Sequence, residues 1–270
     1  MSAITFTTDY GLSDAFVAAC HGVVLRIAPD VRVVDVTHLV PAGDVRRGAY
    51  VLADAVPFFP DGTVHVAVVD PGVGTERRAI VVETPRGLLV GPDNGLLLPA
   101  AAALGGVRAA FSLLEPAGSG VGPAGSHTFH GRDLFMPVAA RLASGISAAE
   151  VAAPVSALVH LPELVFRHGA GWLEAEVRTV DRFGSLQLAA SAEQLDAVAP
   201  VGAQVYLHLP DGRELDAVRG VTFGAVPDGK LVVLVDSTGR AAIAVNAGSA
   251  TDLLATPAGS LLRISRMEAG

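Results

Sequence analysis

Residues 63–72 read TVHVAVVDPG, an apolar and β-branched run followed directly by aspartate, proline and glycine. A run of this kind, bounded by turn residues, is typical of a β-strand. The Asp-Pro-Gly that follows ends the strand in a turn. The sequence therefore predicts a strand over residues 63–69, with the carboxylate of Asp70 at its carboxyl end.

Strands alternate with helices on both sides of this segment. The alternation predicts an α/β domain with a central mixed, mostly parallel sheet flanked by helices. In such sheets ligands bind beyond the carboxyl ends of the strands, where Asp9 and Asp70 both fall. The other predicted elements are strands over residues 3–8 and 31–36, a hairpin over 79–91, and helices over 14–28, 44–55, 94–104 and 133–144.

After about Leu158 the pattern changes to short strands separated by glycine-containing turns. This predicts a small all-β domain, a barrel or a compact sandwich. We place the α/β domain at residues 1–160 and the all-β domain at 170–270. The strands predicted for the second domain cover residues 172–180, 185–189, 203–209, 214–221, 230–235 and 241–245.

Composition narrows the functional classes. The 270 residues are 51% hydrophobic and 17% charged, which allows a large core, and the formal net charge is −8. No lysine- or arginine-rich run appears, which argues against non-specific nucleic-acid binding. The single cysteine, Cys20, excludes an intrachain disulfide and fits a packing role. Because neither a signal peptide nor a membrane span is evident, we expect a soluble cytoplasmic protein. The acidic net charge is compatible with a cationic small molecule as its ligand.

The first candidate binding group is Asp9, in the segment Thr-Thr-Asp-Tyr-Gly at 7–11. A carboxylate at a strand end can accept both hydrogen bonds of a vicinal diol such as a ribose. The alternative is that Asp9 caps its turn and that Ser13 or Asp14 caps the following helix.

The second is the glycine-rich loop at 70–78, which begins with Asp70 and carries Arg77 seven residues on. It lacks the Gly-Lys-Ser/Thr ending of a phosphate-binding loop. Folded back on itself, the loop would pair Asp70 with Arg77 and keep the carboxylate ionised. The alternative is a tight turn with a surface ion pair.

The third is the segment His-Thr-Phe-His-Gly-Arg-Asp at 127–133. His127 and His130 could ligate a metal together with acids from elsewhere. His130 could equally be a polar catalytic group held beside an aspartate and an arginine. A third possibility is a polar start to the helix that follows.

The last candidates lie in the all-β domain. Phe183 and Phe223 could sandwich a flat base, and Asn246 with nearby backbone amides could read an adenine edge. The alternative is that all of them belong to ordinary turns and core of the domain.

Taken together, these segments resemble the S-adenosyl-L-methionine hydrolases, or hydroxide adenosyltransferases, which are relatives of the fluorinase and chlorinase. The resemblance spans nearly the whole chain. The motifs on which it rests are TDYG at 8–11, DPGVGTER at 70–77, PDNGL at 92–96, TFHGRD at 128–133, DRFG at 181–184 and IAVN at 243–246.

The resemblance implies a C-terminal β-barrel and a homotrimer with substrate bound at subunit interfaces. It implies a catalytic set of Asp70, Arg77 and His130, with Asp9 on the ribose and no metal or cofactor. The methionine end would be held near Asp14, Asp181, Ser237 and Thr238, and the adenine near Phe183, Phe223, Asn246 and Ala247.

The residue types suit hydrolysis of a sulfonium. Methionine leaves as a neutral thioether, so the leaving group needs neither a general acid nor a metal. The site has to hold one water in line with the C5′–S bond and exclude other solvent. Asp70 can accept a hydrogen bond from that water, while Arg77 and His130 orient the water and the carboxylate.

Three alternatives remain beside metal-free hydrolysis. A halogenase on this scaffold is disfavoured because its relatives carry Tyr where this chain has Asp70, and the fluorinase carries Tyr-Ser in place of His130-Gly131; an ionised carboxylate would repel a halide. An adenosyl-binding sensor with little turnover would not need the catalytic set. A metal-dependent hydrolase built on His127 and His130 is the weakest. Departures from the family pattern are Ser185, Thr238 and the absence of an aromatic residue at Ala42-Gly43.

Overall fold

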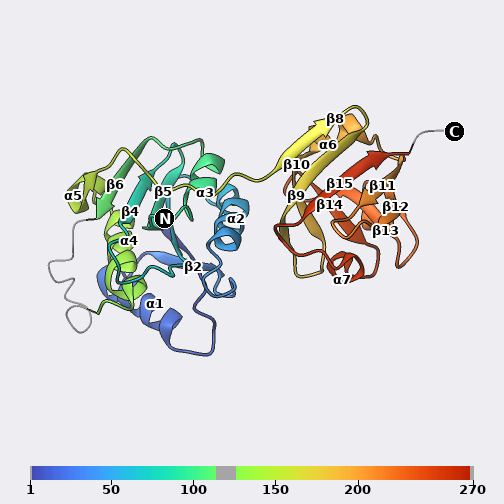
Figure 1. Cartoon of the computed structure of the whole chain (residues 1–270). Helices are drawn as coiled ribbons and strands as arrows, with labels where there is room; N and C mark the ends of the chain where they lie inside the picture. The colour runs from blue at the N-terminus through green and yellow to red at the C-terminus, as the bar shows by residue number, and fades with distance from the viewer. Residues whose placement is uncertain (1, 114–125, 268–270) are drawn as a thin grey trace. The chain divides into compact units, whose positions relative to one another are not determined.

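The computed structural model describes residues 2–113 and 126–267 and divides into two compact units, 1–161 and 162–270 (Figure 1). The first unit holds an α/β sheet and the second holds a β-barrel, so the predicted fold class is confirmed. Within the described ranges, no helix combines the length and the apolar character that a membrane span requires.

The sheet of the first unit has seven strands in the order β2-β1-β3-β5-β4-β6-β7. The pairs β2–β1, β1–β3 and β3–β5 are parallel, whereas β5–β4, β4–β6 and β6–β7 are antiparallel. The predicted hairpin is the β4–β5 pair. The strands are β1 (Ala3–Thr8), β2 (Arg32–Thr37), β3 (Thr63–Val68), β4 (Ala79–Glu83), β5 (Gly87–Pro92), β6 (Ala109–Leu113) and β7 (Ala152–Pro154).

Helices cover both faces of this sheet, which explains why the central strands are apolar on both sides. On β3, Val64, Val66 and Val68 pack toward α1 (Phe16–Ile27) and α4 (Met136–Ala143). Ala67 and its neighbour Val69 pack on the opposite face, with α2 (Val45–Ala55) and α3 (Leu98–Ala103). The two-residue period of a strand thus separates two hydrophobic layers.

Two predicted helices begin differently from expectation. Residues 94–97 form turns, and α3 begins only at Leu98 because the Asn94 side chain bonds backbone groups instead. The helix predicted from Asp133 begins as a π-turn, η2 (Gly131–Phe135), and continues as α4. Such π-turns concentrate at functional sites. The remaining short helices of this unit are η1 (Val56–Phe58) and α5 (Ala148–Val151).

The second unit closes into a seven-stranded barrel, because β9–β10–β14–β13–β12–β11–β15 returns to pair with β9. Its core is built from alternating inward residues, as on β10 with Leu186 and Leu188. The elements are β8 (Phe166–Gly169), β9 (Trp172–Val180), β10 (Leu186–Ser191), α6 (Ala192–Val198), β11 (Gln204–His208), β12 (Glu214–Arg219), η3 (Phe223–Ala225), β13 (Leu231–Val235), β14 (Arg240–Val245), α7 (Ala250–Leu254) and β15 (Leu261–Arg266).

His65 makes the first unit sensitive to acid. Its ring on β3 is 1% exposed and its Nδ1 lies 2.8 Å from Thr5 Oγ1. Burial, with a smaller contribution from the charge of Arg86, lowers the pKa of His65 to about 4. Because the unfolded chain takes up this proton at about pH 6.5, stability is lost as the pH falls from there toward 4, by about 3 kcal/mol in all.

This prediction is checked by denaturant unfolding at pH 7 and pH 4.5, in the wild type and in His65→Gln. We expect the variant to lose distinctly less stability on acidification than the wild type. Equal losses in the two proteins would mean that other groups carry the acid sensitivity.

Candidate active site

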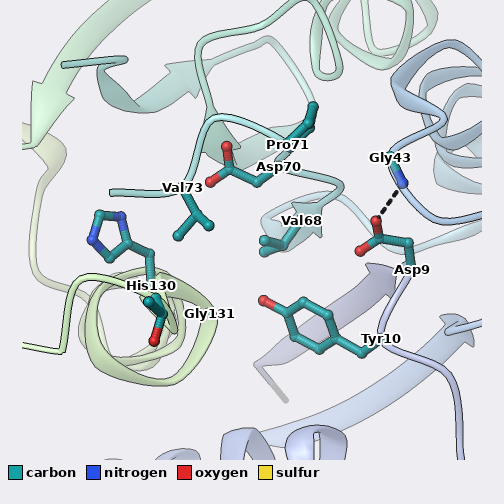
Figure 2. Close-up of a pocket in the computed structure, with 10 residues that line it drawn as sticks. Asp9, Tyr10, Gly43, Val68, Asp70, Pro71, Val73, His130 and Gly131 are labelled. Carbon is teal, nitrogen blue, oxygen red and sulfur yellow. Dashed lines mark hydrogen bonds between the residues drawn. The ribbon is translucent and has the colours of Figure 1, made fainter. Parts of the chain in front are cut away.

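The carboxyl ends of β1 and β3 meet at one edge of the sheet and form a cavity of about 270 Å³. The two strands are parallel neighbours with Thr8 opposite Val68, so Asp9 and Asp70 emerge at the same edge. Figure 2 shows His130 and Asp9 on opposite sides of this cavity, with the Tyr10 hydroxyl pointing toward its middle. The lining residues are Asp9, Tyr10, Gly43, Val68, Asp70, Pro71, Val73, Thr128, His130 and Gly131.

Arg77 joins Asp70 to His130. Its Nε donates to both carboxylate oxygens of Asp70 at 3.0 and 2.9 Å, and its Nη2 lies 2.5 Å from Oδ2. The same Nη2 lies 2.6 Å from Nδ1 of His130. The side chains of Asp70 and Arg77 are only 5% and 11% exposed, so the loop forms a buried ion pair rather than a surface one. The Phe135 ring, 5.4 Å from the guanidinium, packs beneath it.

This arrangement sets the protonation of His130. An arginine is always charged and only donates, so Nδ1 of His130 must accept and the neutral ring carries its proton on Nε2. Burial lowers the pKa of His130 below its usual range, and the charge of Arg77 adds to the effect. His130 is therefore a neutral imidazole at pH 7.

The loop that carries Asp70 and Arg77 is held at both ends. Nδ2 of Asn94 donates to the carbonyl of Val69, next to Asp70, at 2.9 Å. Next to Arg77, Arg78 is bound by the buried carboxylate of Asp93. The Pro-Asp-Asn-Gly segment therefore positions the loop without lining the cavity.

Glycine is required at the top of this loop. Gly74 has φ +78°, and a Cβ there would lie 2.5 Å from the carbonyl oxygen of His127. The absence of a side chain lets the loop approach the segment that carries His130.

Asp9 faces the cavity from the β1 side. Its Oδ2 accepts a hydrogen bond from the backbone N–H of Gly43 at 2.8 Å. This contact uses the Ala42-Gly43 loop, in which an aromatic residue was expected from the family pattern. Burial raises the pKa of the neighbouring Tyr10, with further contributions from Cys20, Asp9 and Asp70, so Tyr10 is a neutral phenol that can donate into the cavity.

Asp14 lies apart from these groups. It is exposed, lies 3.5 Å from Ser13 Oγ, and does not line the cavity. The alternative capping role is wrong for both residues, because α1 has Ala15 at its N-cap and no side-chain hydrogen bond there.

The candidates in the barrel lie on three turns and on the short helix η3. Oδ1 of Asp181 accepts from the backbone N–H groups of Phe183 and Ser185, both at 2.8 Å. The Phe183 ring is 77% exposed. Gly184 in this turn packs against Ser249, two residues after Ala247.

Asn246 and Thr238 are both engaged within the barrel. Nδ2 of Asn246 donates to the carbonyl of Val226 and to Asp228. Val226 lies three residues after Phe223, whose side chain is 51% exposed. Thr238 donates to Oδ1 of Asp236 through N and Oγ1, and Ser237 beside it is exposed. Ala247 has φ +54°, which turns the chain sharply after β14. The turn that carries Asp181 and Phe183 thus lies against Ser249, two residues after Ala247, while Ser237 and Thr238 belong to a separate turn.

Two matches to known protein families identify the family of this chain. Residues 4–152 match the family described as SAM hydroxide adenosyltransferase N-terminal domain, and residues 175–263 match its C-terminal domain. The chain belongs to the SAM hydroxide adenosyltransferase family.

Similar proteins agree with this family. An (R)-S-adenosyl-L-methionine hydrolase of Salinispora tropica is 57% identical over 264 residues, 97% of each chain. A fluorinase of an Actinoplanes species is 29% identical over 282 residues, 90% of this chain and 91% of the relative. The crystal structure of an uncharacterized conserved protein from Thermotoga maritima superposes with a TM-score of 0.90 at 32% identity, covering 98% of this chain and all of that one.

Several residues that line this cavity were not predicted from the sequence. Tyr10 and Thr128 stand inside the quoted motifs, so adjacency to Asp9 and His130 was the available signal. Gly131 was used only as a contrast with the fluorinase. A Cβ at Gly131 would lie 2.2 Å from the Tyr10 hydroxyl, so glycine is what allows Tyr10 to sit against the start of η2.

The described residues do not place His127 and His130 in a metal-binding arrangement. Among them, neither His127 nor His130 belongs to a group of three histidine, cysteine or acidic ligand atoms close enough to share an ion. In addition, Nδ1 of His130 is occupied by Arg77.

The protonation of His130 can be measured directly. We expect its Cε1 proton, assigned by comparison with His130→Gln, to titrate in NMR with a midpoint below the ordinary value of about 6.5. In Arg77→Met the midpoint should rise, because a positive neighbour is removed while Asp70 remains. A His130 midpoint at or above about 6.5 would contradict the assignment.

Proposed function

We propose that this chain hydrolyses S-adenosyl-L-methionine to adenosine and L-methionine, by in-line attack of one water on C5′. The observation that carries the proposal is the Asp70–Arg77–His130 network, whose carboxylate and imidazole line the same cavity as Asp9. The names and identities of the similar hydrolases support the substrate.

Asp70 and His130 have distinct parts in this mechanism. Asp70 accepts a hydrogen bond from the water and aims its lone pair at C5′. His130, whose Nδ1 is engaged by Arg77, turns Nε2–H toward the cavity as a donor that holds the water oxygen. Arg77 fixes both side chains and is itself kept from rotating by three contacts with Asp70.

The bond changes balance without a cofactor. The water oxygen forms a bond to C5′ while the C5′–S bond breaks. The electron pair of the C5′–S bond goes to sulfur, and methionine leaves as a neutral thioether. The water proton passes to Asp70 and then to solvent. Since Arg77 already compensates the Asp70 charge, we propose that this proton leaves late, after attack has begun. A solvent isotope effect that required a preformed hydroxide would contradict this order.

Asp9 is proposed to hold the ribose. Its Oδ2 is oriented by Gly43, which leaves Oδ1 to accept from the vicinal hydroxyls. The cavity of about 270 Å³ is small beside the 300 Å³ or more, roughly, that ligand pockets usually offer. Further walls are therefore needed for the rest of the substrate.

We propose that barrel residues supply those walls, in a homotrimer with its active sites at subunit interfaces. Adenine would contact Phe183, Phe223, Asn246 and Ala247. The Phe183 and Phe223 side chains are exposed, and the backbone turns sharply at Ala247. The methionine end would contact Asp14, Asp181, Ser237 and Thr238. Following the names of the relatives, we propose the (R) sulfonium epimer as the preferred substrate, and the cytoplasm as the location of the enzyme.

Two features disfavour halide as the nucleophile. The carboxylate of Asp70 lines the cavity and would repel an anion there. The side chain of a serine at Gly131, as in the fluorinase pattern, would collide with Tyr10 as it is packed here.

The test is incubation of the purified chain with S-adenosyl-L-methionine in ¹⁸O-water containing EDTA, followed by mass spectrometry. We expect adenosine labelled at its 5′ oxygen, absent in Asp70→Ala and retained in Asp30→Ala, an exposed aspartate outside the cavity. Binding without product would favour an adenosyl sensor, and product lost with EDTA would favour metal-dependent hydrolysis. The two sulfonium epimers are compared in separate reactions.

A further inference from the structure

A second cluster of polar side chains lies outside the cavity, between α1 and the edge strand β2. It consists of His21 on α1, Asp35 on β2 and His38 just after β2. Oδ1 of Asp35 lies 2.8 Å from Nε2 of His21 and 3.1 Å from Nε2 of His38. The three ligand atoms all lie within 4.8 Å of one another.

His38 is the unusual member of this cluster. Its side chain is 3% exposed, yet Nε2 makes no hydrogen bond with any described residue, although it lies close to Asp35. A buried polar atom without a partner is costly, and native structures leave few of them. The Nε2 atom therefore points into the cluster with its bonding capacity unused.

The other nitrogen of His38 is already engaged. Nδ1 lies 2.9 Å from Oγ1 of Thr8, and the Phe6 ring packs edge-on at 4.9 Å between centroids. If Nδ1–H donates to Thr8, the Nε2 lone pair faces Asp35 and His21. Histidine ligands of metals typically hold their second nitrogen in this way, which fixes both tautomer and ring orientation.

The spacing fits a small tetrahedral ion. Bonds of about 2.0–2.1 Å to imidazole nitrogen and carboxylate oxygen imply ligand atoms about 3.3–3.4 Å apart. The observed 2.8 and 3.1 Å need only a slight outward shift of exposed groups, because His21 and Asp35 are 31% and 39% exposed. Two imidazoles with one carboxylate favour zinc or a similar transition metal over calcium or magnesium, which prefer oxygen ligands.

We propose that His21, Asp35 and His38 bind one zinc-type divalent ion, with water in the fourth position. The ion ties α1 to the edge strand and holds the turn that follows β1. That turn is linked to His38 twice, since Gly11 N–H donates to the His38 carbonyl at 2.8 Å and Thr8 Oγ1 accepts from Tyr10 N–H at 3.1 Å. The role is structural, distinct from the water-positioning set at Asp70.

The test uses the full chain without an affinity tag, stripped with chelator and dialysed against Zn²⁺. We expect about one bound ion per chain by elemental analysis, and a thermal midpoint raised by about 5–10 °C at saturating Zn²⁺. His21→Ala and Asp35→Asn, both at partly exposed positions, should bind at least about tenfold more weakly and lose the thermal shift. The exposed His160→Ala, in the same unit, is the matched control.

Two results would overturn the proposal. One is a wild-type chain that retains no Zn²⁺ after dialysis. The other is binding and thermal shift of equal size in wild type, His21→Ala and Asp35→Asn, which would place the ion elsewhere. Neither result depends on turnover, so the zinc site and the proposed hydrolysis fail or succeed separately.

Discussion

Replacing Asp70 by alanine is expected to lower kcat by about 10³-fold or more. The reason lies in the geometry, since the Asp70 carboxylate lines the cavity and Arg77 holds both of its oxygens. Without it, nothing placed by the loop accepts the water proton. The substrate dissociation constant should change much less, because in the proposed complex other residues hold the adenosyl and methionine ends.

Asp70→Asn refines this result. The amide keeps the size of the side chain but not its charge, so it should lose nearly as much activity as Asp70→Ala while keeping the fold. Initial rates of adenosine formation and equilibrium binding of substrate are measured on the same preparations. More than about a tenth of wild-type kcat in either variant would remove Asp70 from the reaction.

Replacing Arg77 by methionine is expected to reduce both activity and stability. The Asp70 carboxylate is 5% exposed, so removal of its partner leaves a buried charge uncompensated. Loss of one partner of such a pair costs about 3–5 kcal/mol. Because His130 also loses its contact at Nδ1, both groups that we propose to position the water lose their support, and kcat should fall by about 10²-fold.

A double variant separates the two effects. Asp70→Asn/Arg77→Met has no buried charge, so it should recover most of the stability lost in Arg77→Met while remaining inactive. Denaturant unfolding of all four proteins gives the coupling energy. If the losses of the two single variants simply add, the ion pair does not hold the loop as described. Arg77→Lys should rescue part of the stability and little of the rate, because an ammonium cannot contact Asp70 and His130 in the same geometry.

Much of the site was predictable from the chain because it lies at strand ends. An apolar run that ends in an acidic residue marks both a buried strand and the edge where ligands bind, and this holds for Asp9 and Asp70 alike. The pairing of Asp70 with Arg77 was one of two alternatives. The pairing required the turn at Gly74, which lies close to His127. No local sequence pattern predicts that contact.

Other features could not be predicted from local patterns. The start of α3 depends on Asn94 reaching the Val69 carbonyl, and Gly131, where the π-turn begins, packs against Tyr10 from a distant part of the sequence. Strand β15, which closes the barrel, was missed although Leu262 and Ile264 alternate with polar residues. The cluster of His21, Asp35 and His38 joins three positions with no recognisable motif spacing.

The sequence by itself determined the fold class, the family and the two carboxylates at the sheet edge. The reason is that hydrophobic period, turn residues and ordered motifs are properties of the chain read in one direction. Only the tertiary structure decided that Arg77 engages Asp70 and His130 at once, that Tyr10 and Gly131 share one wall, and that His38 is buried with an unused nitrogen. These are contacts between segments far apart in sequence, and they exist only once β1 and β3 have paired and their loops have packed together.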